Sequence, residues 1–226
     1  MKKLLILTVL PLLIASCTIN INGAKTIKCK GPVEERDIKL SADFKAIEIN
    51  GGFDVKLVDA PCALAVKANG DAFDYLEFKV KDNGTLVIET KDHVNIAAEE
   101  CLFTISSDKL NKLEVNGAVD LEYTCTAEYA EPFDIVVNGA GDMELKNFTG
   151  PALSVKINGA ADLDIAELKT QSLAIAINGA GDVNVSGEAD EASFTVNGAG
   201  AINATQLVTK NSPNVSTSGL ASVQLN

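Results

Sequence analysis

The chain contains no tryptophan and a single histidine, and aromatic residues make up only 5% of its 226 residues. Without aromatic bulk, the core has to be built from valine, isoleucine, leucine and alanine, which favours thin, regular β layers. His93 has Asp92 beside it but no serine elbow nearby, so it is expected to be an exposed loop residue. Arg36 is the only arginine, which is too little for a site that binds acidic sugars.

Basic residues are also scarce, at 19 lysines and arginines against 31 aspartates and glutamates, for a net charge of −12. An acidic surface repels phosphate, and no basic patch is interleaved with aromatics, so nucleic acid is excluded as a partner. Carboxylates are so common that a pair such as Asp162 and Asp164 carries no catalytic signal. We expect no enzyme activity and no cofactor.

Long hydrophobic runs are missing except at the start. The run Leu4–Ile14 is shorter than the 20 or so residues that span a bilayer. It follows Lys2 and Lys3 and ends in Ile14-Ala15-Ser16-Cys17, which resembles a bacterial lipoprotein signal. An ordinary secretory peptide is the alternative.

The lipoprotein interpretation predicts that residues 1–16 are a signal peptide and that Cys17 carries acyl chains. Residues 17–32 then form the tether, and the membrane is a partner through this anchor. The protein is expected in the cell envelope. Thr18 follows the anchoring cysteine where an aspartate would favour the inner membrane, so by analogy we expect the outer membrane.

Four further cysteines could form disulfides outside the cytoplasm. They allow three pairings, which the sequence cannot rank, and the exported location favours at least one bridge. No CxxC spacing accompanies the single histidine, so no zinc site is expected. The four are Cys29, Cys62, Cys101 and Cys125.

One short motif is repeated along the chain. It reads VNGAGDMEL at 137–145, INGAADLDI at 157–165 and INGAGDVNV at 177–185, with weaker copies at 49, 115 and 196. The asparagines of successive copies from 116 onward lie 19 to 22 residues apart. A fixed period near 20 is typical of a solenoid, in which each coil stacks on the last.

Within each coil the apolar residues alternate, as in half-buried strands. Stacked at the period, they form columns such as Val137, Ile157, Ile177 and Val196. A coil of 20 residues is roughly 66 Å of extended chain, which suits three short strands around a triangular section. We therefore expect an all-β fold in which residues 110–226 form a right-handed, parallel β-helix-like solenoid.

The repeated Asn-Gly supplies the corner of each coil, because it adopts positive φ with little strain. Asparagines one coil apart can hydrogen-bond as an amide ladder. The expected ladder comprises Asn50, Asn116, Asn138, Asn158, Asn178 and Asn197.

Aspartates follow each corner, at Asp54, Asp120, Asp142, Asp162 and Asp182. Stacked carboxylates about 5 Å apart repel unless water or a cation intervenes. Asp142, Asp162 and Asp182 are therefore candidate calcium ligands. The preferred interpretation is solvated aspartate that favours turns.

The N-terminal half, residues 33–109, is less regular. Its clearest feature is FKVKDNGTLVIET at 78–90, which alternates on both sides of Asp82-Asn83-Gly84-Thr85 and predicts a hairpin. This region either continues the solenoid or caps it, because open coil edges invite pairing between chains.

The order of these motifs resembles a known family. VEERDIKLSADFKAIEINGGFDVKL at 33–57, then GTLVIE, then the NGAGD repeats are similar to the auto-transporter adhesin, head GIN domain family of bacterial envelope proteins. The resemblance covers residues 33–226 and implies a β-helix-like fold, an envelope location and an adhesin role. It offers no binding residues to carry over, and the four internal cysteines are not part of its pattern.

These observations predict a non-enzymatic, lipid-anchored envelope protein that acts as an adhesin or as a surface-binding or structural module. Its glycan or protein ligand stays open. The alternative is a β-helix protein that binds or processes glycans with surface carboxylates. Tyr75, Tyr123 and Tyr129 could stack sugars in that case, although positions at the edge of the core fit them better.

Overall fold

The structure, a computed structural model, describes residues 25–226. The predicted signal peptide, the predicted lipidation site Cys17 and the first part of the tether lie outside the described residues. The described chain is all-β apart from two 3-10 turns, η1 (Gly70–Asp74) and η2 (Lys91–His93). No helix in residues 25–226 has the length and apolar character that a membrane crossing needs.

Fourteen strands follow one another along the chain. They are β1 (Thr26–Lys28), β2 (Val33–Asp37), β3 (Ala46–Val58), β4 (Ala63–Asn69), β5 (Leu76–Val80), β6 (Thr85–Thr90), β7 (Asn95–Ala97), β8 (Cys101–Ser106), β9 (Lys112–Thr124), β10 (Phe133–Val137), β11 (Ala140–Lys146), β12 (Thr149–Ile157), β13 (Ala160–Thr209) and β14 (Asn214–Leu225).

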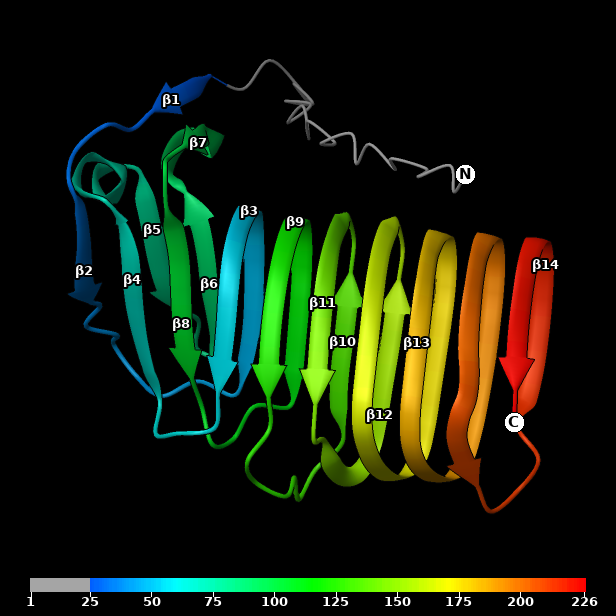
Figure 1. The fold of residues 1–226 in the computed structure, drawn as a ribbon. Coiled ribbons are helices and arrows are strands. Elements are labelled where there is room, and N and C mark those ends of the chain that lie inside the picture. Colours follow the sequence, from blue (N-terminus) through cyan, green and yellow to red (C-terminus); the bar gives the residue numbers. More distant parts are fainter. Residues whose placement is uncertain (1–24) are drawn as a thin grey trace, which may run out of the picture.

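Successive stretches of about 20 residues lie side by side in parallel register, and we call each stretch a rung. Val137 of β10 pairs with Ile157 of β12, which pairs with Ile177 of β13. Figure 1 shows the rungs in chain order from β3 to β14. The predicted all-β fold with parallel strands is therefore confirmed.

The core is a set of aliphatic columns inside the rungs. Val137, Ile157, Ile177 and Val196 are each 0% exposed. Burying an aliphatic side chain of this size contributes about 1.5–3 kcal/mol relative to leaving it exposed, so each added rung stabilises its neighbours. The alternation in the sequence corresponds to this inside-outside pattern.

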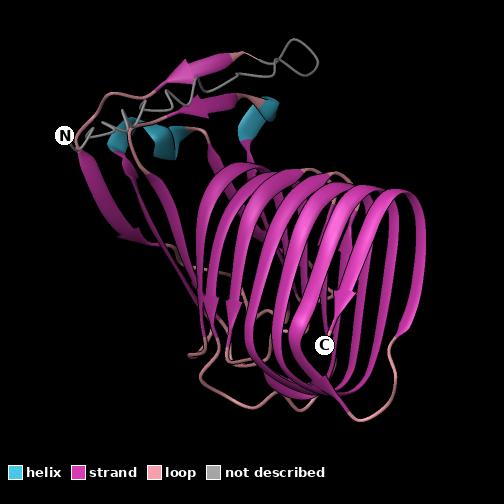
Figure 2. Cartoon of the chain, turned by 45° about the vertical axis from the view of Figure 1, so that its right-hand side comes forward, coloured by secondary structure: helices cyan, strands magenta, loops and turns pink. Residues whose placement is uncertain are grey.

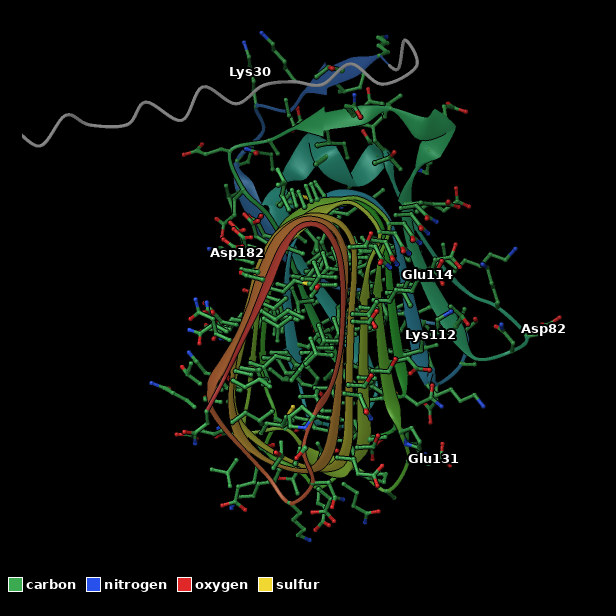
Figure 3. The ribbon with its side chains drawn as sticks, turned by 90° about the vertical axis from the view of Figure 1, so that its right-hand side faces the viewer. Lys30, Asp82, Lys112, Glu114, Glu131 and Asp182 are labelled. Atoms are coloured by element: carbon green, nitrogen blue, oxygen red, sulfur yellow. The ribbon has the colours of Figure 1, made fainter. Side chains whose placement is uncertain are left out.

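Seen along the stack, the rungs have two long sides that meet at a narrow corner beside Asp182 and a broader base opposite (Figure 3). The three short strands per coil expected from the sequence do not form in the later rungs, where β13 runs unbroken for 50 residues around both ends. Parallel stacking lets the backbone ladder continue through the bends. Left-handed residues mark the base, with φ of 59° at Asn147 and 57° at Glu167.

The N-terminal half is joined to this stack. β3 pairs in parallel with β9 along its whole length, and with β6 and β8 on its other side. Antiparallel strands complete this end, since β4 pairs with β8, β2 with β4, and β5 with β6 in the hairpin expected at 78–90. Figure 2 shows the 3-10 turns gathered at the same end.

All four cysteines in the described chain are free thiols, so the expected disulfide is wrong for this structure. Cys62 has its Sγ near the Phe44 carbonyl oxygen (3.4 Å) instead. Burial, helped by the charge of Asp54, raises the pKa of Cys101 to about 12. Burial also raises the pKa of Cys125. Both thiols are thus protonated at neutral pH and pack as small apolar groups.

Candidate functional site

The six repeated asparagines form one continuous hydrogen-bonded column at the narrow corner. Each Nδ2 donates to the Oδ1 of the asparagine one rung earlier, at 2.8–3.0 Å. Asn50, the first asparagine of the column, has no earlier asparagine to bind, and its Nδ2 donates to Glu48 Oε1 at 3.0 Å instead. The column is exposed and fully used in holding rungs together, which assigns it a structural role.

The glycine after each asparagine is required by close approach of the backbones. A Cβ at Gly159 would lie 1.9 Å from the carbonyl oxygen of Gly139, and one at Gly179 would lie 2.0 Å from that of Gly159. The positive φ expected from the Asn-Gly pair is present at Gly51 (φ 152°), Gly117 (158°) and Gly198 (148°), whereas Gly139, Gly159 and Gly179 do not adopt it. The tight rung spacing selects glycine there.

The aspartates stack in register as predicted from the period, with Asp120 opposite Asp142 and Asp142 opposite Asp162. Asp162 Oδ1 accepts the backbone N–H of Asp182 at 2.8 Å, and Asp182 Oδ1 accepts that of Ala201 at 3.1 Å. Within residues 25–226, no three His, Cys, Asp or Glu side chains are grouped so that they could hold a metal ion. These contacts give the column a role in bracing the next rung.

A cleft of about 370 Å³ opens at the base of the stack, and we call it the basal cleft. It lies between the loops 107–111 and 126–131, which connect β8 to β9 and β9 to β10. Figure 3 shows Glu131 of this cleft at the base, far from Asp182 at the corner. The longer spacing from Asn116 to Asn138 accommodates the second loop.

Hydrogen bonds to Asp59 hold one wall of the basal cleft in place. Asp59 Oδ1 accepts the hydroxyls of Tyr123 (2.6 Å) and Tyr129 (3.2 Å). Its Oδ2 accepts the backbone N–H groups of Thr126 and Ala127. Burial and the charge of Asp59 raise the pKa of Tyr129, so this phenol remains a donor. The loop is held in place before any ligand binds, which lowers the entropy cost of binding.

Tyr129 belongs to a cluster of three nearly parallel aromatic rings at the cleft. Its ring centroid lies 5.1 Å from that of Phe148 and 5.6 Å from that of Phe133, with interplanar angles of 26° and 23°. Both phenylalanines are 0% exposed, whereas Tyr129 is half-buried and lines the cleft. One side of its ring therefore packs on the core, and the rest is presented to the cleft.

Charged groups of both signs surround this ring. They come from three separate segments and form no ion pair among the described residues. Free donors and acceptors at one hollow can bind a ligand that offers both. These residues are Lys45, Asp108, Lys109, Glu128 and Glu131.

Sequence patterns missed most of this site. Tyr123 and Tyr129 were expected at the edge of the core; Tyr129 is half-buried there, but Tyr123 is 1% exposed and lies within the core, and both hydroxyls donate to Asp59. Tyr75, the third candidate for sugar stacking, follows η1 and does not line the cleft. His93 ends η2, and its side chain lies outside the described part of the structure. The one available signal was the irregular, non-alternating stretch between Cys125 and Glu131.

Fold and site together define an all-β repeat protein that carries ligand-accessible loops at the base of stacked parallel strands. The chain belongs to the family described as "Putative auto-transporter adhesin, head GIN domain", whose model matches residues 43–226. This confirms the family expected from the motif order.

Two solved structures share this fold. A putative adhesin from Bacteroides fragilis has a TM-score of 0.68 at 18% identity, covering 88% of this chain and all of its own. A putative adhesin from Parabacteroides distasonis has a TM-score of 0.57 at 16% identity, covering 89% of this chain and all of its own. At these identities the likeness shows the fold. No curated protein matches the chain.

Proposed function

We propose that this chain is a non-enzymatic, lipid-anchored adhesin of the bacterial cell envelope, in which a right-handed β-solenoid holds binding loops away from the membrane. The family supports the adhesin role, since its description names one. The parallel pairing of residues that lie 20 apart in the sequence, such as Ile157 with Ile177, supports the solenoid.

One observation carries the proposal. The described chain begins at β1, beyond the corner edge of the stack, whereas the loops of the basal cleft lie at the opposite edge (Figure 1). A chain anchored through Cys17 would therefore hold its basal loops outward. The asparagine column and the close backbone stacking make the intervening part a stiff spacer.

The anchor is tested by radiolabelled palmitate in cells that make the wild type or Cys17→Ser. We expect label and membrane fractionation for the wild type, and neither for the variant, because acylation needs the thiol. Adhesion of cells to host or bacterial surfaces should fall when the protein is deleted. An unlabelled wild type found in the cytoplasm, or unchanged adhesion after deletion, would refute the proposal.

The purified protein tests the absence of catalysis. A glycosidase needs two carboxyl groups held about 5–5.5 or 6.5–9.5 Å apart around the scissile bond. Sugar release from a polysaccharide panel by the purified protein, abolished by Asp108→Asn or Glu131→Gln, would overturn the non-enzymatic assignment. We expect no release.

A further inference from the structure

We propose that the basal cleft binds a neutral saccharide of one or two sugar rings, with a sugar face on Tyr129 and hydroxyls on the surrounding charged side chains. This inference rests on the proposed adhesin function and names the class of its ligand.

The size and shape of the cleft favour a small polar ligand. Its volume of about 370 Å³ is at the lower end of the range for sites that enclose small molecules. Loop 126–131 is already fixed by hydrogen bonds from Thr126, Ala127 and Tyr129 to Asp59. A ligand therefore meets a formed wall and has little ordering cost to overcome.

The aromatic wall favours a ligand with a flat apolar face. Tyr129 cannot rotate freely, because its ring packs on Phe133 and Phe148 and its hydroxyl donates to Asp59. An aromatic ring with its partial negative charge on the face attracts weakly positive C–H groups. The C–H face of a pyranose ring offers such groups over the area of one tyrosine.

The polar wall excludes other ligand classes. Asp108, Glu128 and Glu131 repel phosphates, nucleotides and uronates, and the polar rim disfavours an acyl chain because its charges would be desolvated without a partner. Sugar hydroxyls both donate and accept. They can donate to the carboxylates and accept from Lys45 and Lys109 at the same time.

The test uses the mature lipidated protein in detergent micelles, titrated calorimetrically with neutral disaccharides of glucose, mannose, xylose and N-acetylglucosamine. We expect at least one of them to bind. Glu131→Gln and Asp108→Asn should each weaken that binding about fivefold, because the amide oxygen still accepts a hydroxyl but loses the extra roughly 1 kcal/mol of a hydrogen bond to a charged acceptor. Tyr129→Leu should weaken it at least about tenfold.

Asp82→Asn is the matched control, because it removes one exposed carboxylate at the hairpin tip, well away from Glu131 (Figure 3). It should bind as the wild type does. Glu131→Gln also guards against misfolding, since Glu131 is exposed and touches neither Asp59 nor the ring stack. Its circular dichroism and melting temperature should match the wild type.

Three outcomes would overturn the inference. They are no binding of any of these disaccharides, binding that Glu131→Gln, Asp108→Asn and Tyr129→Leu leave unchanged, and binding of a fatty acid in place of sugars. Failure of the adhesin proposal is separate, because it appears as unchanged cell adhesion after deletion. Adhesion that needs the protein but survives all three cleft variants would refute only the saccharide site.

Discussion

Replacing Gly159 with alanine tests the tight stacking of rungs most directly. The added Cβ would lie 1.9 Å from the Gly139 carbonyl oxygen and 2.9 Å from its carbonyl carbon. Contacts between real Cβ atoms and backbone are almost never below 3.0 Å. Gly159 does not adopt positive φ, so the cost is steric, with no added backbone strain.

The size of the effect follows from what must move. Rungs have to separate by more than about 1 Å at the corner, which disrupts the two backbone bonds between them there, Ala160 N–H to Gly139 C=O (2.8 Å) and Asn158 N–H to Val137 C=O (2.7 Å). At about 1 kcal/mol for each bond, plus about 1–3 kcal/mol for overpacking, we expect a loss of about 3–5 kcal/mol. In a chain of this size that lowers Tm by about 10 °C.

The assay is thermal unfolding followed by circular dichroism, with urea unfolding for the free energy. Ala160→Ser is the control, because it adds one atom to the adjacent, exposed side chain. It should change stability by less than about 0.5 kcal/mol. A Gly159→Ala protein that melts within about 2 °C of the wild type would show that the rungs are not stacked this closely.

Three other predictions follow from the corner and the base. Asn158→Ala removes the bonds to Asn138 (2.8 Å) and from Asn178 (3.0 Å), and should cost about 1–2 kcal/mol in urea unfolding; an unchanged midpoint would mean that the column adds no stability. Asp59→Asn weakens the charged bonds that hold loop 126–131, so limited proteolysis should cut this loop faster than in the wild type, and identical digestion would contradict its fastening role. Burial and the charge of Asp120 raise the pKa of Asp54 in the folded protein above its ordinary value of 3.8. The ionised Asp54 carboxylate therefore destabilises the fold at pH values above the raised pKa. This destabilisation disappears as the pH falls below 3.8, where the carboxyl group is protonated in both the folded and the unfolded chain. Asp54→Asn should thus raise Tm at pH 7 and leave it unchanged near pH 3; a gain of equal size at both would exclude the electrostatic cause.

The periodic features were predictable because they repeat. Every rung meets the same neighbours, so a residue such as Asn158 has an equivalent before and after it, and its spacing alone predicts its contacts. The buried column through Ile157 and Ile177 follows in the same way from alternation. The corner glycines were predicted correctly in position, but the predicted reason holds only in part: positive φ occurs at Gly117 and Gly198, whereas close backbone approach alone selects glycine at Gly159.

The basal cleft could not be predicted in this way. Its parts are far apart in the chain, with 70 residues between Asp59 and Tyr129. Loop conformation depends on such distant hydrogen bonds and has no period that a pattern could reveal. The sequence also could not predict that the four cysteines are free, because the distance between two thiols depends on how the chain packs.

By itself, the sequence determined the period, the aliphatic interior and the corner chemistry of this protein, because parallel stacking forces equal residues onto equal positions. Only the tertiary structure decided where the irregular loops meet and which charges they leave unpaired around Tyr129. Repetition encodes local neighbours in the order of residues, whereas a cleft built from separate loops exists only once the whole chain has packed.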